Sequence, residues 1–145
     1  MPSASVKRLI KNNKNKLIEF VLDIEKYPEF IPFCLGSKVY ERKDKGDITF
    51  IIADLTIGKG PFVDTYKSDV QYNKKSDTIF VTNIDGPLKF LENNWKFTEQ
   101  GDLTEVIFDV NFEIKNKFLN ILMTSSFQYG LEKIADAFQK RAENI

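Results

Sequence analysis

The segment Tyr27-Pro28-Glu29-Phe30-Ile31-Pro32-Phe33-Cys34 follows a predicted helix and decides how the chain continues after it. Its two prolines disfavour helical geometry at the residues before them, so the helix must end here. The segment also carries three aromatic side chains. A surface turn is usually polar because its backbone needs water. An apolar, proline-framed turn packs over the edge of a core or over the mouth of a cavity, and the segment alone leaves both interpretations open.

The composition is that of one globular domain spanning residues 1–145, with 42% hydrophobic residues and 13 phenylalanines. The formal net charge is zero, so the global field typical of nucleic-acid-binding proteins is absent. No run of residues approaches the roughly 20 apolar positions that cross a bilayer. Cys34 is the single cysteine, which excludes an internal disulfide. We therefore expect a cytoplasmic protein.

Periodicity predicts a strand, a helix, several more strands and a long final helix. Residues 4–10 form the first expected strand, and Asn12 or Asn13 caps a helix that runs to about residue 26. Short turns then separate runs of strand-forming residues, so neighbouring strands should be antiparallel. The expected strands are 37–42, 47–57, 61–71, 78–83, 88–98 and 103–114.

The last strand and the final helix show which surfaces form the core. In residues 103–114 apolar and polar side chains alternate, which indicates a sheet with one wet face. Residues 117–143 carry an apolar stripe at helical spacing, made of Leu119, Met123, Phe127, Leu131, Ile134 and Phe138. Both segments span roughly 40 Å, so the helix can lie along the apolar face of the sheet. The expected fold class is α+β, a curved antiparallel sheet wrapped around a long C-terminal helix.

Three segments, in order and at matching spacing, resemble the signatures of a known family. They are the segment 27–34, Gly86-Pro87-Leu88-Lys89-Phe90-Leu91 with Trp95-Lys96-Phe97, and Ala137-Phe138-Gln139-Lys140-Arg141-Ala142. Together they resemble the coenzyme Q-binding START-domain family, which is also classed as polyketide cyclase/dehydrase-like. The resemblance implies a helix-grip fold with a hydrophobic tunnel. It further implies binding of ubiquinone or a related polyprenyl lipid, in support of respiration or quinone synthesis. Phe33 stands where the family usually has Trp, so an indole N–H donor is lost there.

The resemblance suggests two sets of ligand-binding residues. Tyr27, Phe30, Pro32 and Phe33 are expected to gate the mouth of the tunnel, and Trp95, Phe108, Phe112, Phe127 and Leu131 are expected to line its interior. Core packing is the alternative role of the same aromatic side chains, and the sequence does not separate the two.

The residues for common catalytic and metal sites are missing. The chain has no histidine, which removes the most common general base and most zinc sites. We therefore expect a non-enzymatic lipid carrier with no metal and no cofactor. A cyclase or dehydratase that uses Tyr27 or Asp54 is the less favoured alternative.

The start of the chain is basic and suggests two further partners. Lys7, Arg8, Lys11, Lys14 and Lys16 precede the first acidic residue, Glu19. Such a segment fits a transient, peripheral contact with an anionic inner-membrane surface. It fits ribosomal RNA equally well, and bacterial relatives of this family are described as toxins that block association of ribosomal subunits. Translation inhibition is therefore the alternative function, and no contact with DNA is expected.

Overall fold

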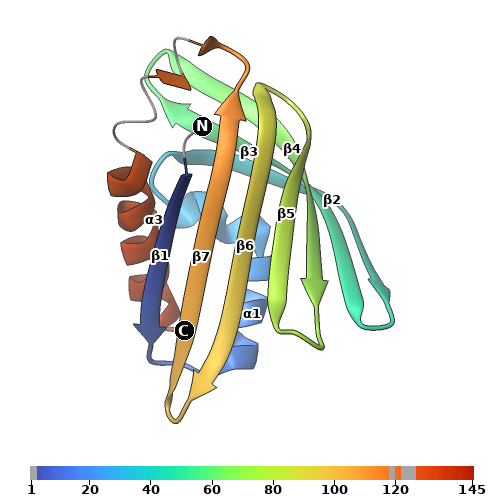
Figure 1. The fold of residues 1–145 in the computed structure, drawn as a ribbon, viewed down its shortest axis with the longest axis vertical. Coiled ribbons are helices and arrows are strands. Elements are labelled where there is room, and N and C mark those ends of the chain that lie inside the picture. Colours follow the sequence, from blue (N-terminus) through green and yellow to red (C-terminus); the bar gives the residue numbers. More distant parts are fainter. Residues whose placement is uncertain (1–2, 118–119, 122–126) are drawn as a thin grey trace.

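A curved antiparallel sheet forms the body of the protein (Figure 1). The computed structural model describes residues 3–117, 120–121 and 127–145. Over these residues the strands follow the order β1-β7-β6-β5-β4-β3-β2. Their bounds are β1 Ser3–Ile10, β2 Cys34–Lys45, β3 Ile48–Lys59, β4 Phe62–Asn73, β5 Thr78–Asp85, β6 Leu88–Gln100 and β7 Leu103–Ile114. The predicted α+β helix-grip fold is confirmed.

The helices are α1 Lys14–Leu22, the 3₁₀ helix η1 Ile24–Glu29 and α3 Phe127–Ala142. Asn13 caps α1 by accepting a hydrogen bond from the backbone N–H of Lys16 at 2.8 Å. The predicted extension of α1 to about residue 26 is wrong, because the chain tightens into η1 after Asp23. Pro28 lies inside η1. Residues 117, 120 and 121 are also helical, but Leu119 and Met123 of the predicted stripe lie outside the described residues.

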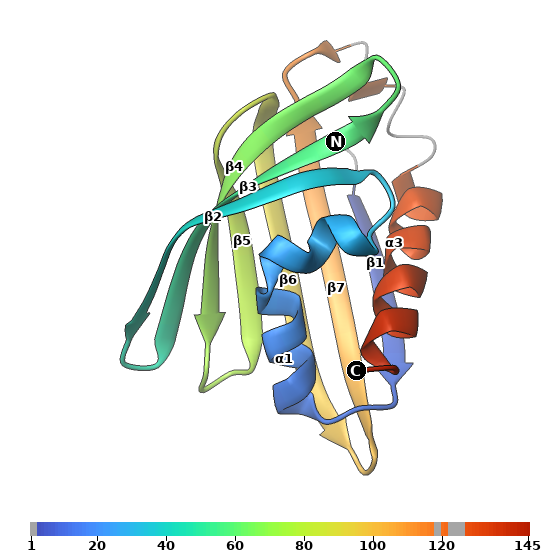
Figure 2. The same ribbon diagram turned by 180° about the vertical axis from the view of Figure 1, so that it is seen from behind.

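The helix α3 stands beside the edge strand β1, and α1 lies in front of the concave face of the sheet (Figure 2). Two glutamines of α3 satisfy carbonyl groups on the free edge of β1. Gln128 donates to the carbonyl of Ser5 and Gln139 to that of Leu9, both at 3.1 Å. An uncovered edge strand exposes unpaired backbone groups. These two bonds pair carbonyl groups on the edge of β1 that has no neighbouring strand.

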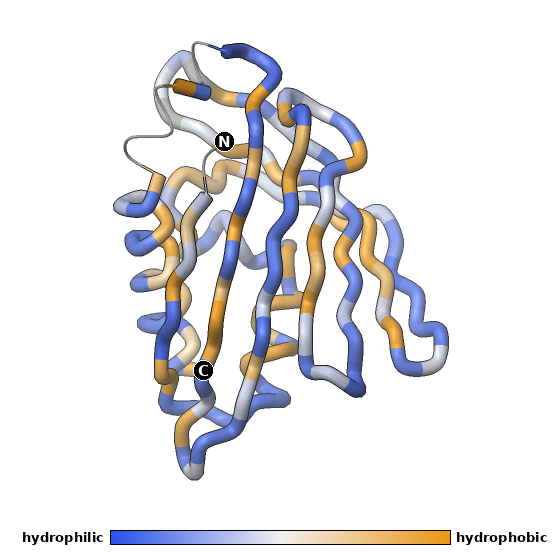
Figure 3. Tube along the Cα trace, viewed as in Figure 1, coloured by the Kyte–Doolittle hydropathy of each residue, from blue (hydrophilic) through white to orange (hydrophobic). Residues whose placement is uncertain are grey.

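The two ends of the molecule differ in what covers the sheet. The lower end in Figure 1 holds the start of α1 and the β4–β5 and β6–β7 turns. The upper end holds the β3–β4 turn, the β5–β6 turn and the start of α3. Apolar and polar residues alternate along the upper part of β7, as a sheet with one buried face requires (Figure 3).

The side chain of Asn83 hydrogen-bonds to the backbone of β6 beside a shift in strand register. The register between β6 and β7 shifts between Leu88 and Phe90. The Asn83 amide accepts a hydrogen bond from the N–H of Leu91 at 3.0 Å and donates to the carbonyl of Leu88 at 3.1 Å. Backbone groups that the bulge leaves without strand partners are thereby paired.

Candidate functional site

The aromatic side chains of the segment 27–34 separate into an inner and an outer group. Tyr27 and Phe30 point inward onto Phe138 of α3, with ring centroids 5.5 and 5.3 Å away. Phe138 also contacts Phe20 of α1 and Trp95 of β6, at 5.6 and 5.3 Å. We call these five residues the aromatic hub. The Tyr27 hydroxyl donates to the carbonyl of Val21, which ties η1 to the end of α1.

Phe33 belongs to the outer group and lies at the upper end. Its backbone has φ 68°, in the left-handed region that bulky residues rarely adopt, and its side chain is 47% exposed. The N–H of Gly58 donates to the Phe33 carbonyl at 2.9 Å, which fixes this conformation against β3. Pro32, beside it, is partly buried. Four residues were expected at the mouth. The structure places Phe33 at a solvent-exposed rim, with Pro32 beside it, whereas Tyr27 and Phe30 belong to the hub.

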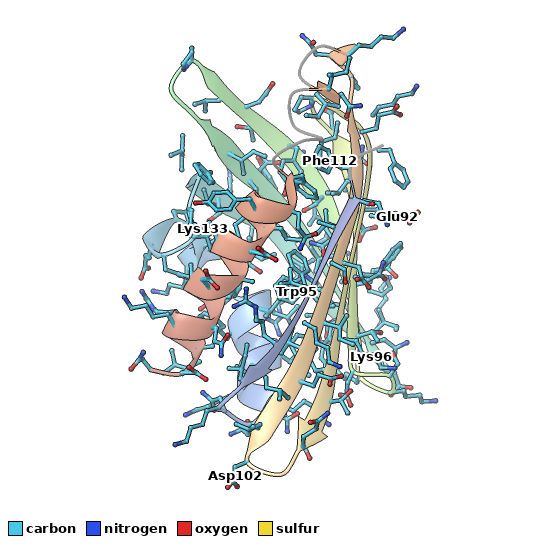
Figure 4. The ribbon with its side chains drawn as sticks, turned by 60° about the vertical axis from the view of Figure 1, so that its left-hand side comes forward. Glu92, Trp95, Lys96, Asp102, Phe112 and Lys133 are labelled. Carbon is cyan, nitrogen blue, oxygen red and sulfur yellow. The ribbon has the colours of Figure 1, made fainter. Side chains whose placement is uncertain are left out.

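The residues expected to line the interior form two neighbouring groups. Trp95 stacks on Phe108 with ring centroids 4.0 Å apart and joins the hub. Nearer the upper end, Phe112 contacts Phe127 at 4.5 Å, beside the buried Leu131. Figure 4 shows Trp95 and Phe112 on the helix side of the sheet and Glu92 and Lys96 on its outer side. All five predicted lining residues face the concave side, and their contact with a ligand remains a prediction.

Inward-facing side chains of the concave wall differ in burial between its two ends. Inward-facing side chains near α1 are buried, among them Ile51, Val70, Ile79 and Phe97. Near the upper end Leu91 and Phe112 are buried, but several other inward-facing side chains are only partly buried, namely Ser37, Leu55, Tyr66, Leu88 and Ile114. A cavity of about 20 Å³ beside Trp95 and Phe108 is just large enough for one water molecule. The side chains of Leu55, Leu88 and Ile114 are therefore more accessible than the inward-facing side chains near α1.

A second pocket lies away from the predicted site residues. Its volume is about 280 Å³, and it is lined by Glu19, Leu22, Asp23, Ile24, Glu25, Val39, Arg42 and Ile51. Arg42 pairs there with Glu19 at 3.5 Å. Carboxylates line part of this pocket, so its chemistry does not suit an apolar tail.

Polar groups in the interior are the feature that sequence reasoning missed. The Ser37 hydroxyl and the Asn93 side-chain carbonyl are buried, and neither has a hydrogen-bond partner among the described residues. Burial raises the pKa of the Tyr66 phenol well above its ordinary value, and Cys34 nearby adds to the effect. Strand alternation in β4 could have placed Tyr66 inside, but a missing partner is visible only in three dimensions.

The basic residues at the start of the chain are largely paired. Lys7 lies 3.3 Å from Glu105, Arg8 lies 2.6 Å from Asp136 and Lys14 lies 3.1 Å from Asp77. Lys11 and Lys16 are exposed and have no ion pair within the described part of the chain. The membrane contact predicted for this segment therefore depends mainly on two free lysines.

The described residues contain no cluster of His, Cys, Asp and Glu that suits a metal ion. Among the same residues, no helix is both long and apolar enough to span a bilayer.

Comparison with known proteins identifies the family. Residues 16–139 match the family described as polyketide cyclase / dehydrase and lipid transport. The chain belongs to this family. The resemblance inferred from the three motifs is confirmed, and the chain has the START-like fold of the family.

Family members similar to this chain carry two kinds of name. A ribosome association toxin RatA of Rickettsia prowazekii is 28% identical over 95% of this chain and 94% of its own length. The mitochondrial coenzyme Q-binding protein COQ10 of Dictyostelium discoideum is 31% identical over 94% of this chain and 66% of its own length. The solution structure of the 18 kDa protein CC1736 from Caulobacter crescentus has a TM-score of 0.81 at 26% identity, covering 99% of this chain and 97% of that one.

The two inner tyrosines predict a distinctive alkaline titration. Burial raises the pKa of Tyr27 and of Tyr66 above the ordinary 10.0, with smaller contributions from neighbouring groups such as Cys34. The unfolded chain loses these protons near pH 10.0, whereas the folded chain keeps them. Their contribution to stability is therefore fully present below that pH and is lost as the pH rises above it.

We expect the phenolate absorbance of these two tyrosines to appear only as the protein unfolds, and Tyr66→Phe to reduce the absorbance change that accompanies unfolding. Circular dichroism recorded along the same titration provides the reference. Ionisation of both phenols while the fold is intact would contradict their burial.

Proposed function

We propose that this chain binds a polyprenyl quinone or a closely related prenyl lipid in the concave interior and carries it without transforming it. The observation that supports this best is the open, largely apolar wall at the upper end, where Leu55, Leu88 and Ile114 remain partly accessible. Burial of one five-carbon prenyl unit contributes roughly 3–4 kcal/mol, at about 0.8 kcal/mol per buried CH₂. The family description includes lipid transport, and the similar COQ10 protein is named for coenzyme Q binding.

An enzymatic alternative has less support from the residues first suggested for it. The Tyr27 hydroxyl is engaged by the Val21 carbonyl. The Asp54 carboxylate lies on the convex face, where it accepts a hydrogen bond from Tyr40 at 2.6 Å. Neither group is directed at the open part of the interior, so binding without catalysis remains the better proposal for this member of a family that also includes cyclases.

Carriage of a prenyl lipid predicts that the ligand survives purification. We expect mass spectrometry of an organic extract of the native protein to show a prenyl quinone, and added quinone to raise the melting temperature. Leu55→Trp should reduce the amount of lipid recovered, because a larger side chain occupies the open wall. Phe80→Trp, on the outer face of β5, is the matched control and should leave it unchanged. Native protein without prenyl lipid, and with a melting temperature unmoved by quinone, would exclude this function.

A carrier must meet a bilayer, and exposed apolar side chains gather at the upper end. Phe33, Leu35, Ile57 and Val63 come from neighbouring parts of β2, β3 and β4 and the residue before β2, and each is at least 38% exposed. Tyr129 in the first turn of α3 is 65% exposed. We propose that this rim, rather than the paired basic residues of β1, touches the membrane.

The rim predicts membrane binding that resists salt, because apolar contacts are not screened. Phe33→Asn combined with Leu35→Ser should weaken binding to phosphatidylcholine vesicles by about a hundredfold or more, at about 1.5 kcal/mol or more for each side chain. Asn tolerates the left-handed backbone of position 33, so folding should be preserved. Leu9→Ser combined with Phe80→Ser removes similarly exposed side chains outside the rim and should have no effect in vesicle flotation. Binding that disappears in high salt would instead favour the basic segment.

A second candidate function, inhibition of translation, is favoured by a cluster on the convex face. Tyr40 is 48% exposed, and the Nζ atoms of Lys38 and Lys67 each lie 4.7 Å from the centre of its ring. An exposed aromatic ring flanked by lysines suits single-stranded RNA, which offers bases for stacking and phosphates for pairing. The similar RatA proteins are named ribosome association toxins.

Sucrose-gradient profiles of ribosomes test this second function. If it is correct, added protein lowers the monosome fraction, and Tyr40→Ala combined with Lys38→Ser abolishes the effect. The rim variant Phe33→Asn should act like the unmodified chain. An unchanged monosome fraction with the unmodified protein would exclude the function.

A further inference from the structure

A row of three side chains crosses the open end of the concave wall. Ser37 of β2 pairs with Leu55 of β3, and Leu55 pairs with Tyr66 of β4. Residues paired directly across adjacent antiparallel strands lie on the same face of a sheet, so all three side chains face the interior. All three are partly buried, as expected at the boundary between the filled core and the mouth.

The two hydroxyls at the ends of this row have no acceptor. The Ser37 hydroxyl is buried without a partner, and the Tyr66 hydroxyl makes no hydrogen bond within the described part of the chain. Two other tyrosines differ, because Tyr27 donates to the Val21 carbonyl and Tyr40 donates to the Asp54 carboxylate. Buried polar groups are nearly always paired, so the unpartnered Ser37 hydroxyl is unusual, and the Tyr66 hydroxyl on the same row has no protein acceptor among the described residues.

The position of Tyr66 is fixed by the neighbouring turn. A Cβ atom on Gly86 would lie 2.8 Å from both Cα and Cβ of Tyr66, so the β5–β6 turn packs directly against the base of this side chain. Gly86 also has φ +129°, a conformation that side chains disfavour. The ring itself packs in the cluster that contains Leu88, Leu91 and Phe112. Contacts at the base of the side chain and around the ring therefore hold the Tyr66 hydroxyl in place.

The surroundings select the chemistry of a ligand. Both groups are neutral donors, and the raised pKa of Tyr66 keeps its proton in place. The nearby Cys34 thiol is neutral as well, because burial raises its pKa, and it lies 3.7 Å from the Gly36 carbonyl. The side chains around the row are mainly apolar and no cation pairs with either hydroxyl among the described residues. A phosphate or carboxylate would lose its hydration without a counter-ion, whereas a carbonyl oxygen accepts hydrogen bonds at low desolvation cost.

We propose that Ser37 and Tyr66 form a carbonyl-binding site at the mouth of the interior, where their hydroxyls donate to a neutral head group of quinone, ketone or ester type. The apolar tail then packs on Leu55, Leu88 and Ile114. This inference rests on the proposed lipid-binding function and adds the head-group chemistry to it. The buried side-chain carbonyl of Asn93 also lacks a partner among the described residues, but it lies two rows closer to the hub and outside this row.

The test compares two probes that share a tail: a short-chain ubiquinone and the hydrocarbon with the same number of prenyl units. Tyr66→Phe and Ser37→Ala should each weaken quinone binding roughly five- to tenfold, as loss of one hydrogen bond implies, and leave hydrocarbon binding unchanged. Tyr72→Phe is the matched control, because Tyr72 lies on the same strand and face but at the lower end. Infrared spectra of the bound quinone provide a second measurement. The carbonyl stretch of the quinone should shift to lower frequency in the unmodified protein. In the double variant, which combines Tyr66→Phe with Ser37→Ala, it should return to the frequency of the unbound quinone.

The ligand-free proteins give a readout that does not depend on binding. Removal of an unpartnered hydroxyl should leave the melting temperature unchanged or raise it, so weaker quinone binding cannot be attributed to unfolding. If the double variant binds quinone as tightly as the unmodified chain, the carbonyl site is excluded while the lipid-binding function stands. If the unmodified chain binds neither probe, the lipid-binding function fails, and the carbonyl site fails with it.

Discussion

The packing of Phe138 is the contact on which the rest of the structure depends. One side chain from the C-terminal helix touches Phe20 of α1, Tyr27 of η1, Phe30 after η1 and Trp95 of the sheet. Aromatic pairs of this kind contribute about 0.5–1.5 kcal/mol each beyond the area they bury. These partners lie in α1, in η1, directly after η1 and in the sheet. The hub therefore holds the helices against the sheet.

The hub also divides the interior. Between α1, η1 and the lower half of the sheet the aromatic rings pack with buried aliphatic side chains in one cluster. Beyond the hub, α3 closes the edge of β1 and the concave wall remains accessible. The same set of large side chains thus packs the helices against one end of the sheet, while several inward-facing side chains at the other end stay partly accessible.

Much of the fold follows from patterns in the sequence, and the reasons are local. Alternation in residues 103–114 correctly assigned the inward face of β7, where Val106, Val110 and Phe112 are buried. The stripe in the last helix correctly included Leu131 and Phe138. Short turns between strands fixed the antiparallel order. The end of α1 was placed too late, because the apolar spacing of Leu17, Val21 and Ile24 continues smoothly from the α-helix into η1.

By itself, the sequence determined the order of elements, the inward face of the last strand and the family, because periodicity, turn residues and motifs act over short stretches of chain. The tertiary structure decided which aromatic residues of the segment 27–34 become core and which become rim. Tyr27 and Phe30 can be buried only where Phe138 meets them, more than 100 positions later in the chain. It also decided which polar groups lack a partner, since whether Ser37 or Tyr66 finds an acceptor depends on strands that fold back from elsewhere.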